Sequence, residues 1–377
     1  MNTTSTTPKP LFPNFTQIPS SIPIKVWNIL RIISVVSAIT VCIILFTIPQ
    51  IGLFILWKII IPLLPLVFFI VPGLWRNLCP LAALNQAPRL WGITRGLTHT
   101  NTIKEYSYVI GISLFFLLVF FRKVFFDDSG LGSALLILGA LSLAFLGGVF
   151  FKGKSGWCSS ICPLLPVQRL YGQTPFVTVP NSHCQPCVGC TKNCYDFNPS
   201  VAYLADQYDD DKYYTGYRRF FAGTFPGFVL AFYLVDVPPD TSISMMVLEF
   251  YIYVSISLGT FFLLDTFTKA TNNKLTALYG AAAFNIFYWF NLPTLISSFN
   301  TISGISLPEW FIWILRSLIF GLTLFWVIRT VQTERKFITR ATTSSITSGI
   351  KLGAGAAAAL ERFSKKQQLE KINSANQ

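Results

Sequence analysis

Long apolar runs restrict this chain to one class of fold more strongly than any other feature of its sequence. Eight such runs are present, each of about 20 residues, which is the length an α-helix needs to cross the hydrocarbon core of a bilayer. They cover residues 28–49, 51–75, 106–126, 131–151, 219–237, 243–267, 275–298 and 310–331. The sequence therefore predicts an all-α integral membrane protein with about eight transmembrane helices.

The charge content supports a lipid environment. Only 12% of the residues are charged, whereas about a quarter are charged in an ordinary soluble domain. The formal net charge of +13 is not accompanied by any nucleic-acid recognition motif, so nucleic acid is not an expected partner. The basic residues are better explained as loop residues close to anionic lipid head groups.

Lys and Arg gather in alternate connections and so indicate an orientation. They are concentrated after the second, fourth and sixth runs and in the C-terminal tail, while the opposite connections hold few of them. Because cytoplasmic loops carry the excess of positive charge, we predict a bacterial inner-membrane protein with both termini in the cytoplasm. The stretch 28–75 would measure about 70 Å as one helix, so a tight turn at 49–50 is expected to divide it.

Seven of the eight cysteines lie in two loops on the predicted cytoplasmic side, while Cys42 lies within the first run. A reducing compartment disfavours disulfides, so clustered thiols there indicate a metal centre. Four of them, Cys184, Cys187, Cys190 and Cys194, are separated by two, two and three residues, as in bacterial ferredoxins. Three cysteines at this spacing can wrap around an iron–sulfur cubane, whereas zinc sites more often show two separated pairs.

The other three cysteines belong to a repeated pattern. Cys79 and Cys162 each precede a proline, and Cys158 lies four residues before Cys162. Each Cys-Pro step is followed by a matching segment, Arg-Leu-Trp-Gly at 89–92 and Arg-Leu-Tyr-Gly at 169–172. The first two pairs of runs therefore look like an internal duplication, a common feature of membrane proteins.

The number of thiols leaves the number of clusters open. The first three cysteines of the ferredoxin run need one remote thiolate, and Cys162 is the expected donor. The fourth cysteine of the run then groups with Cys79 and Cys158 around a second cluster that lacks one ligand. Either His183 or Asp196 completes this second cluster, or it is absent and the fourth cysteine of the run closes the first one.

These motifs resemble those of the membrane-bound polyferredoxins. That family includes the quinol-dehydrogenase-type subunit of periplasmic nitrate reduction, the membrane protein that supports nitrous oxide reductase, and an accessory protein of cytochrome oxidase assembly. The resemblance covers roughly residues 51–199 and depends on the Cys-Pro loop at 158–163 and on the run 184–194. It implies one or two [4Fe-4S] clusters, a ferredoxin-like loop, a quinone as a redox partner and other subunits of a membrane redox complex.

The expected function is electron transfer between a cytoplasmic or quinone donor and a redox partner complex, with no catalytic residue assigned. The alternative is a structural or assembly subunit whose cluster only holds a loop in place. Two carboxylates in the sixth run, Glu249 and Asp265, are candidates for carrying protons. The expected divisions are a flexible tail (1–24), a four-helix unit of two hairpins (25–151) with a Cys-Pro loop (76–104), a cytoplasmic iron–sulfur loop (152–216), four further helices (217–331) and a basic, partly helical tail (332–377).

Overall fold

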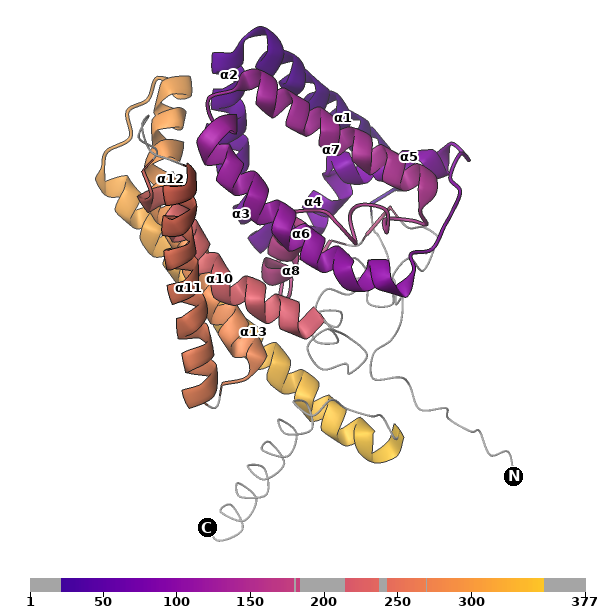
Figure 1. Ribbon diagram of the computed structural model, residues 1–377, viewed down its shortest axis with the longest axis vertical. Helices are drawn as coiled ribbons and strands as arrows, with labels where there is room; N and C mark the ends of the chain where they lie inside the picture. The colour runs from indigo at the N-terminus through magenta and orange to yellow at the C-terminus, as the bar shows by residue number, and fades with distance from the viewer. Residues whose placement is uncertain (1–21, 180, 184–213, 237–242, 269, 349–377) are drawn as a thin grey trace.

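The computed structural model describes residues 22–179, 181–183, 214–236, 243–268 and 270–348 (Figure 1). Within these residues all regular elements are helices, apart from an isolated parallel bridge between Leu97 and Phe151. The helices are α1 (Ile24–Thr47), α2 (Pro49–Leu53), η1 (Phe54–Ile60), α3 (Ile61–Ile70), α4 (Pro72–Leu78), α5 (Pro80–Leu90), α6 (Asn101–Phe121), η2 (Arg122–Phe126), α7 (Gly130–Phe150), α8 (Leu165–Tyr171), α10 (Tyr214–Leu234), α11 (Ile243–Phe267), α12 (Asn272–Ser303) and α13 (Trp310–Ser348).

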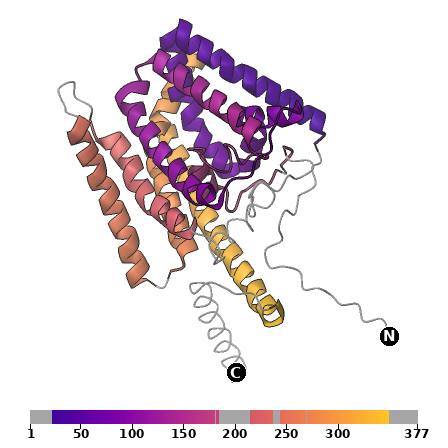
Figure 2. The ribbon, with the colours of Figure 1, turned by 45° about the vertical axis from the view of Figure 1, so that its right-hand side comes forward.

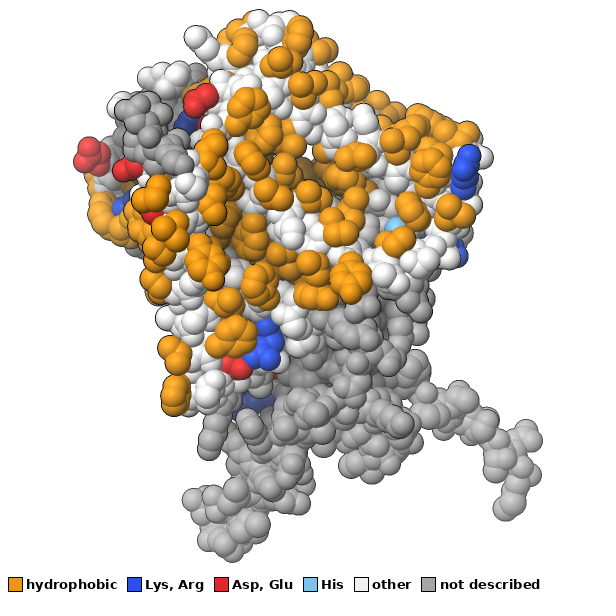
Figure 3. Space-filling view, viewed as in Figure 1, with side chains coloured by type: hydrophobic (Ala, Val, Ile, Leu, Met, Phe, Trp, Pro, Cys, Tyr) orange, Lys and Arg blue, Asp and Glu red, His pale blue; other side chains and the backbone are white. Residues whose placement is uncertain are grey.

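Among the described residues, six helical stretches are long and apolar enough to cross a membrane. They are Ile24–Thr47, Pro49–Ile70, Tyr106–Phe126, Gly130–Phe150, Ile243–Phe267 and Trp310–Lys336. Their outward faces carry large apolar side chains, which Figure 3 shows spread over the surface. The all-α, multi-pass membrane class predicted from the sequence is therefore confirmed, and these stretches correspond to six of the eight predicted runs.

The remaining two predicted runs form α10 and α12, which are not among these six. Length is not the reason, since α10 has 21 residues and α12 has 32. Both helices carry polar side chains that pack within the protein, such as Thr224 in α10 and Asn273 and Asn291 in α12. Because α12 lies between α10 and α13, it faces neighbouring helices more than lipid and needs fewer apolar residues.

A break between α1 and α2 divides the first long apolar stretch. Ile48 has φ −135°, outside the helical region, and Pro49 begins α2. Gly52 permits the close return of the chain, since a Cβ there would lie 2.6 Å from the Cα of Leu45. Two separate spans therefore replace a single long helix, which confirms the predicted tight turn.

The segment that follows α7 enters the bundle. All seven residues of α8 are buried, and the hydroxyl of Tyr171 donates to the carbonyl of Gly280 at 3.0 Å. A Cβ on Gly111 of α6 would lie 3.3 Å from the carbonyl oxygen of Cys162. Helix α8 lies within the region 152–216, which the sequence predicts to be a cytoplasmic loop, and it packs among α3, α6, α10 and α12. The apolar residues of α8 explain this, because burial removes them from water.

The helices α10–α13 stand beside the N-terminal group (Figure 1), and α11 forms the outer edge of this group in the view of Figure 2. A cluster of aromatic rings joins the two groups, since Phe69 lies 4.5 Å from Phe284 and 5.4 Å from Trp326 between ring centroids. The last span continues as one helix to Ser348, so the first part of the predicted tail extends α13 beyond the bundle. The rest of that tail, 349–377, and residues 1–21 lie outside the described residues.

Candidate functional site

The two Cys-Pro steps have matching structures. Cys79 directly precedes α5, and Cys162 lies three residues before the start of α8. Proline suits the beginning of a helix because its fixed φ is helical and its missing N–H has no partner to lose there. Helix α5 ends at Leu90, two residues before Gly92 with φ +72°, and α8 ends at Tyr171, directly before Gly172. Both copies of the repeat therefore contain a short helix between the Cys-Pro step and the glycine.

Cys79, Cys158 and Cys162 line one small cavity of about 20 Å³. Cys79 and Cys162 are buried and Cys158 is half-buried. The wall of the cavity also includes Trp75 and Trp157, which limit access to it. A space of this size holds about one water molecule. All three of the predicted ligands that lie outside the ferredoxin run thus border the same cavity.

Burial favours the protonated form of the Cys79 and Cys162 thiols by raising the pKa of each. It raises the pKa of Cys79, and it raises that of Cys162 to about 12, with the nearby Cys79 adding to the shift. Hydrogen bonds from the backbone N–H groups two and three residues after each cysteine lower the pKa of the thiol and so partly offset this increase. Metal binding would displace the thiol protons, because only the thiolate is a strong ligand.

Two buried cations lie in the wall of the same cavity. Lys154 is 2% exposed and Arg76 is 6% exposed. The charge of Lys154 works against the increase that burial causes in the pKa of Cys79. Cations beside buried sulfur stabilise thiolate over thiol, so the cavity is suited to hold negative charge.

A hydrogen-bond network holds the segment 181–183 against this wall. Oδ1 of Asn77 accepts bonds from the backbone N–H of Ser182 at 2.9 Å and from its hydroxyl at 2.8 Å. Arg31 of α1 donates to the same hydroxyl at 2.5 Å, and Nε2 of His183 lies 3.0 Å from the carbonyl oxygen of Arg76. The chain therefore leaves the described part at His183, one residue before the predicted ferredoxin run, fixed to a residue of the cysteine cavity.

His183 is a neutral imidazole in this position. Burial, followed by the charges of Lys154 and Arg31, holds the pKa of His183 well below its ordinary value. Because a carbonyl only accepts, Nε2 must carry the ring proton and Nδ1 the lone pair. His183, one of the two groups considered as a ligand for a second cluster, thus has a nitrogen able to bind metal. The other group, Asp196, lies outside the described residues.

The cysteines of the ferredoxin run, Cys184, Cys187, Cys190 and Cys194, also lie outside the described residues. Among the residues that are described, no three His, Cys, Asp or Glu side chains come close enough together to hold a metal ion. The three cysteines of the cavity are therefore not a complete metal site by themselves.

Sequence reasoning missed the polar residues that fix this region. Asn77 lies two residues before Cys79 and is completely buried, and Arg31 lies inside an apolar run with 8% of its surface exposed. Arg31 was the one feature of the sequence that could have indicated this network, since a charge within a predicted span usually has a specific partner. Its partner Ser182 is distant in the chain and carries no recognisable motif.

The two carboxylates proposed as proton carriers lie away from the cysteine cavity. Asp265 of α11 forms an ion pair with Arg219 of α10, and Glu249 is exposed on α11. Cys42 is buried within α1 and does not line the cavity, as expected of an isolated thiol.

Comparison of the chain with known protein families, curated proteins and solved structures finds no match.

Proposed function

We propose that this protein is a membrane-bound iron–sulfur protein that transfers electrons. The observation that carries the proposal is the meeting of Cys79, Cys158 and Cys162 at one buried cavity, with the entrance to the ferredoxin run beside it. His183 is bonded to Arg76 in the cavity wall, and consecutive Cα atoms are about 3.8 Å apart. The described chain therefore ends, one residue before the run, at a residue that is bonded to the wall of the cysteine cavity.

The donor set suits [4Fe-4S] clusters. Thiolates are the usual ligands of these clusters, and the buried cations Lys154 and Arg76 would offset their negative charge. We assign the first three cysteines of the run and Cys162 to one cluster. A second cluster would take Cys194, Cys158 and Cys79, with Nδ1 of His183 as its fourth ligand. If only one cluster forms, Cys194 closes it in place of Cys162.

A bound cluster supplies a carrier for single electrons. The chain contributes the holding and shielding of that carrier. The rings of Trp75 and Trp157 shield the thiols from water, and Asn77 and Arg31 fix the approach of the cysteine run. Packing of α8 against α6 and α12 sets the depth at which Cys162 lies within the bundle.

The metal content of the protein tests this proposal. Anaerobically purified protein is expected to contain about four iron and four sulfide per chain for one cluster, or about eight of each for two. Reduction should produce the paramagnetic signal of a cubane. Cys187→Ser should lose most of the iron, while Cys42→Ser, which alters an isolated thiol, should retain all of it. Zinc without sulfide, or no metal in unwashed membranes, would refute the proposal.

We further propose that α10 and α12 also cross the bilayer, which gives eight spans with both termini in the cytoplasm of a bacterium. Six and eight are both even, so the termini share one side in either arrangement. The electron donor is then a cytoplasmic protein or a membrane quinone, and the acceptor is a partner redox complex. In a variant lacking Cys42, Ser374→Cys should resist an impermeant thiol reagent in intact cells and react after lysis; labelling from outside would reverse the orientation.

A second candidate function is that of a structural or assembly subunit. The observation that favours it is the extension of α13 past its span to Ser348, with the basic residues Arg335 and Lys336 at the end of the span and Arg340 on the extension. A scaffold of this kind would co-purify with partners at a fixed ratio and would not accept electrons from artificial donors. Turnover of the isolated protein with such a donor and acceptor would favour electron transfer instead.

A further inference from the structure

A second cavity, of about 240 Å³, lies between the two groups of helices. Helices α3, α6, α8, α10 and α12 supply its walls, which are almost entirely apolar. Leu64, Leu118, Phe225, Val229 and Phe284 are among the side chains that line it. No cysteine lines this cavity, and all of its lining residues are described. An inference about it therefore stands apart from the iron–sulfur proposal.

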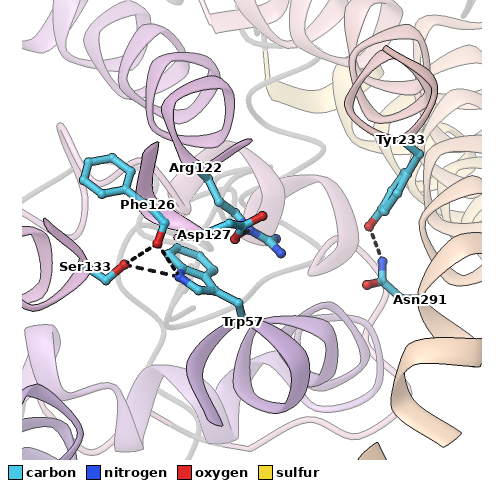
Figure 4. Close-up of polar contacts among 7 residues, drawn as sticks. All are labelled: Trp57, Arg122, Phe126, Asp127, Ser133, Tyr233 and Asn291. Atoms are coloured by element: carbon cyan, nitrogen blue, oxygen red, sulfur yellow. Dashed lines mark hydrogen bonds and ion pairs between the residues drawn. The ribbon is translucent and has the colours of Figure 1, made fainter. Parts of the chain in front are cut away.

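One end of this cavity is polar (Figure 4). Nε of Arg122 lies 2.9 Å from a carboxylate oxygen of Asp127, so the positive charge there is already balanced. The guanidinium of Arg122 lies over the Trp57 ring at 4.6 Å from its centroid. The hydroxyl of Tyr233 accepts a bond from the side-chain amide of Asn291, which leaves its own hydrogen able to donate.

The position of Trp57 is itself fixed. Its Nε1 donates to the carbonyl oxygen of Phe126 at 3.0 Å and lies 3.2 Å from the hydroxyl oxygen of Ser133 (Figure 4). These bonds connect η1 to the turn between α6 and α7. The polar end is therefore held in place by bonds from three segments of the chain.

The cavity also has a route to the surrounding lipid. In Figure 1, α6 and α7 diverge from their junction at η2, and in Figure 3 a hollow opens among apolar side chains between them. Leu118 of α6, Arg122 of η2 and Leu136 of α7 are among the residues that line the cavity. A molecule dissolved in the membrane can enter by this route without crossing water.

We propose that this cavity binds a membrane-dissolved ligand that consists of a hydrocarbon chain and a small uncharged polar head group. Apolar cavities of this size stay dry, so a hydrocarbon chain meets no competing water. The paired charges of Arg122 and Asp127 disfavour an anionic head, whereas Tyr233 can donate a hydrogen bond to a carbonyl or hydroxyl oxygen. An isoprenoid quinone and a neutral glyceride share this chemistry.

Photo-crosslinking of the purified full-length protein in lipid nanodiscs tests the proposal. Three probes carry the same decyl chain with a diazirine and differ in the head: a benzoquinone, a glycerol and a phosphate monoester. At least one uncharged probe is expected to label the residues lining α6, α10 or α12, and excess untagged compound should reduce this labelling at least tenfold. The uncharged probe that is captured identifies the source as a quinone or a glyceride.

Matched variants locate the site. Leu118→Trp fills the cavity and should lower labelling at least tenfold, while Leu117→Trp, on the lipid-facing side of the same helix, should leave it unchanged. Val229→Phe fills the cavity from α10 and provides a second test if the first variant does not fold. Tyr233→Phe keeps the shape and should lower labelling about threefold. Equal labelling in the position-117 and position-118 variants, insensitivity to competitor, or equal capture of the phosphate probe would overturn the proposal.

Discussion

The N-terminal group of helices (22–183) and the C-terminal group (214–348) differ in helix length and in how they bury polar side chains. Beside three helices of 21 to 24 residues, the N-terminal group uses several short helices, with prolines at the start of α2, α4 and α5, and it buries Arg76, Asn77 and Lys154. The C-terminal group uses helices of 21 to 39 residues. The difference indicates that the breaks between short helices in the N-terminal group allow functional side chains to reach the interior.

Proline by itself does not explain this difference. Pro226 and Pro293 lie inside α10 and α12, and both helices continue past them. At the breaks, by contrast, the residue before proline lies outside the helical region, as shown by ψ 71° at Ile48 and ψ 62° at Val71. A break forms where tertiary contacts stabilise the turned chain, because proline only weakens the helix.

The largest expected effect concerns the ring cluster that couples the two groups. Trp326 of α13 is fully buried and contacts Phe69 of α3, so Trp326→Ala should destabilise the protein by about 4 kcal/mol. Trp313 lies on the same helix with 58% of its surface exposed, and Trp313→Ala should cost less than about 1 kcal/mol. Thermal unfolding in detergent measures both, and equal losses would show that the cluster does not couple the groups.

A smaller effect tests the close packing of the N-terminal group. A Cβ on Gly148 of α7 would lie 2.0 Å from the carbonyl oxygen of Asn85 in α5. Gly148→Ala should therefore force the helices apart and cost about 2 kcal/mol. Gly139, on the same helix, has no neighbour within 4 Å of such a Cβ, so Gly139→Ala is its control and should not destabilise. Wild-type melting behaviour of the position-148 variant would contradict the packing described.

A third effect tests whether buried polar bonds serve the site. Asn77→Ala leaves the backbone N–H of buried Ser182 without its acceptor, at a cost of about 2 kcal/mol, and should lower the iron content. Asn285→Ala removes a comparable amide from the C-terminal group, where it donates to Ala281 and Thr323. It should lower the melting temperature without changing iron per chain. Equal iron loss in the two variants would show that the bonds of Asn77 have no special role.

The smallest expected effect concerns the ion pair between α10 and α11. Asp265 and Arg219 are each 26% exposed at the side chain, so Asp265→Asn should cost about 1 kcal/mol or less. Glu249 is exposed on α11, and Glu249→Gln should leave the unfolding midpoint unchanged. A loss of several kcal/mol at Asp265 would mean that the C-terminal group also depends on buried polar bonds.

Local sequence information was sufficient for much of the fold. Apolar runs predicted where every long helix lies, because the lipid solvent imposes both length and composition on a span. The turn before Pro49 followed from the excessive length of the first apolar stretch. The repeated Cys-Pro segments predicted matching units, and Cys79 and Cys162 indeed precede matching short helices. The metal ligands of the run 184–194 stay predictions.

Interior placement was not accessible from local patterns. The sequence 152–156, Lys-Gly-Lys-Ser-Gly, has the composition of a surface loop, yet Lys154 and Ser155 are buried. Their burial depends on partners in distant segments, and local composition does not encode these. For the same reason the apolar runs alone did not show that α12 is a central helix with polar contacts, whereas α11 faces lipid.

The inward position of the segment before α8 has an electrical consequence. The carbonyl of Cys162 lies against Gly111, five residues into the span Tyr106–Phe126, or about a quarter of its length. Moving one elementary charge across a full bilayer costs about 2.3 kcal/mol per 100 mV. Moving that charge to this depth therefore costs about 0.6 kcal/mol per 100 mV. For the proposed function, the transmembrane voltage would then bias the arrival of an electron at a cluster held by Cys162. The apparent reduction potential of that cluster would depend on the membrane potential.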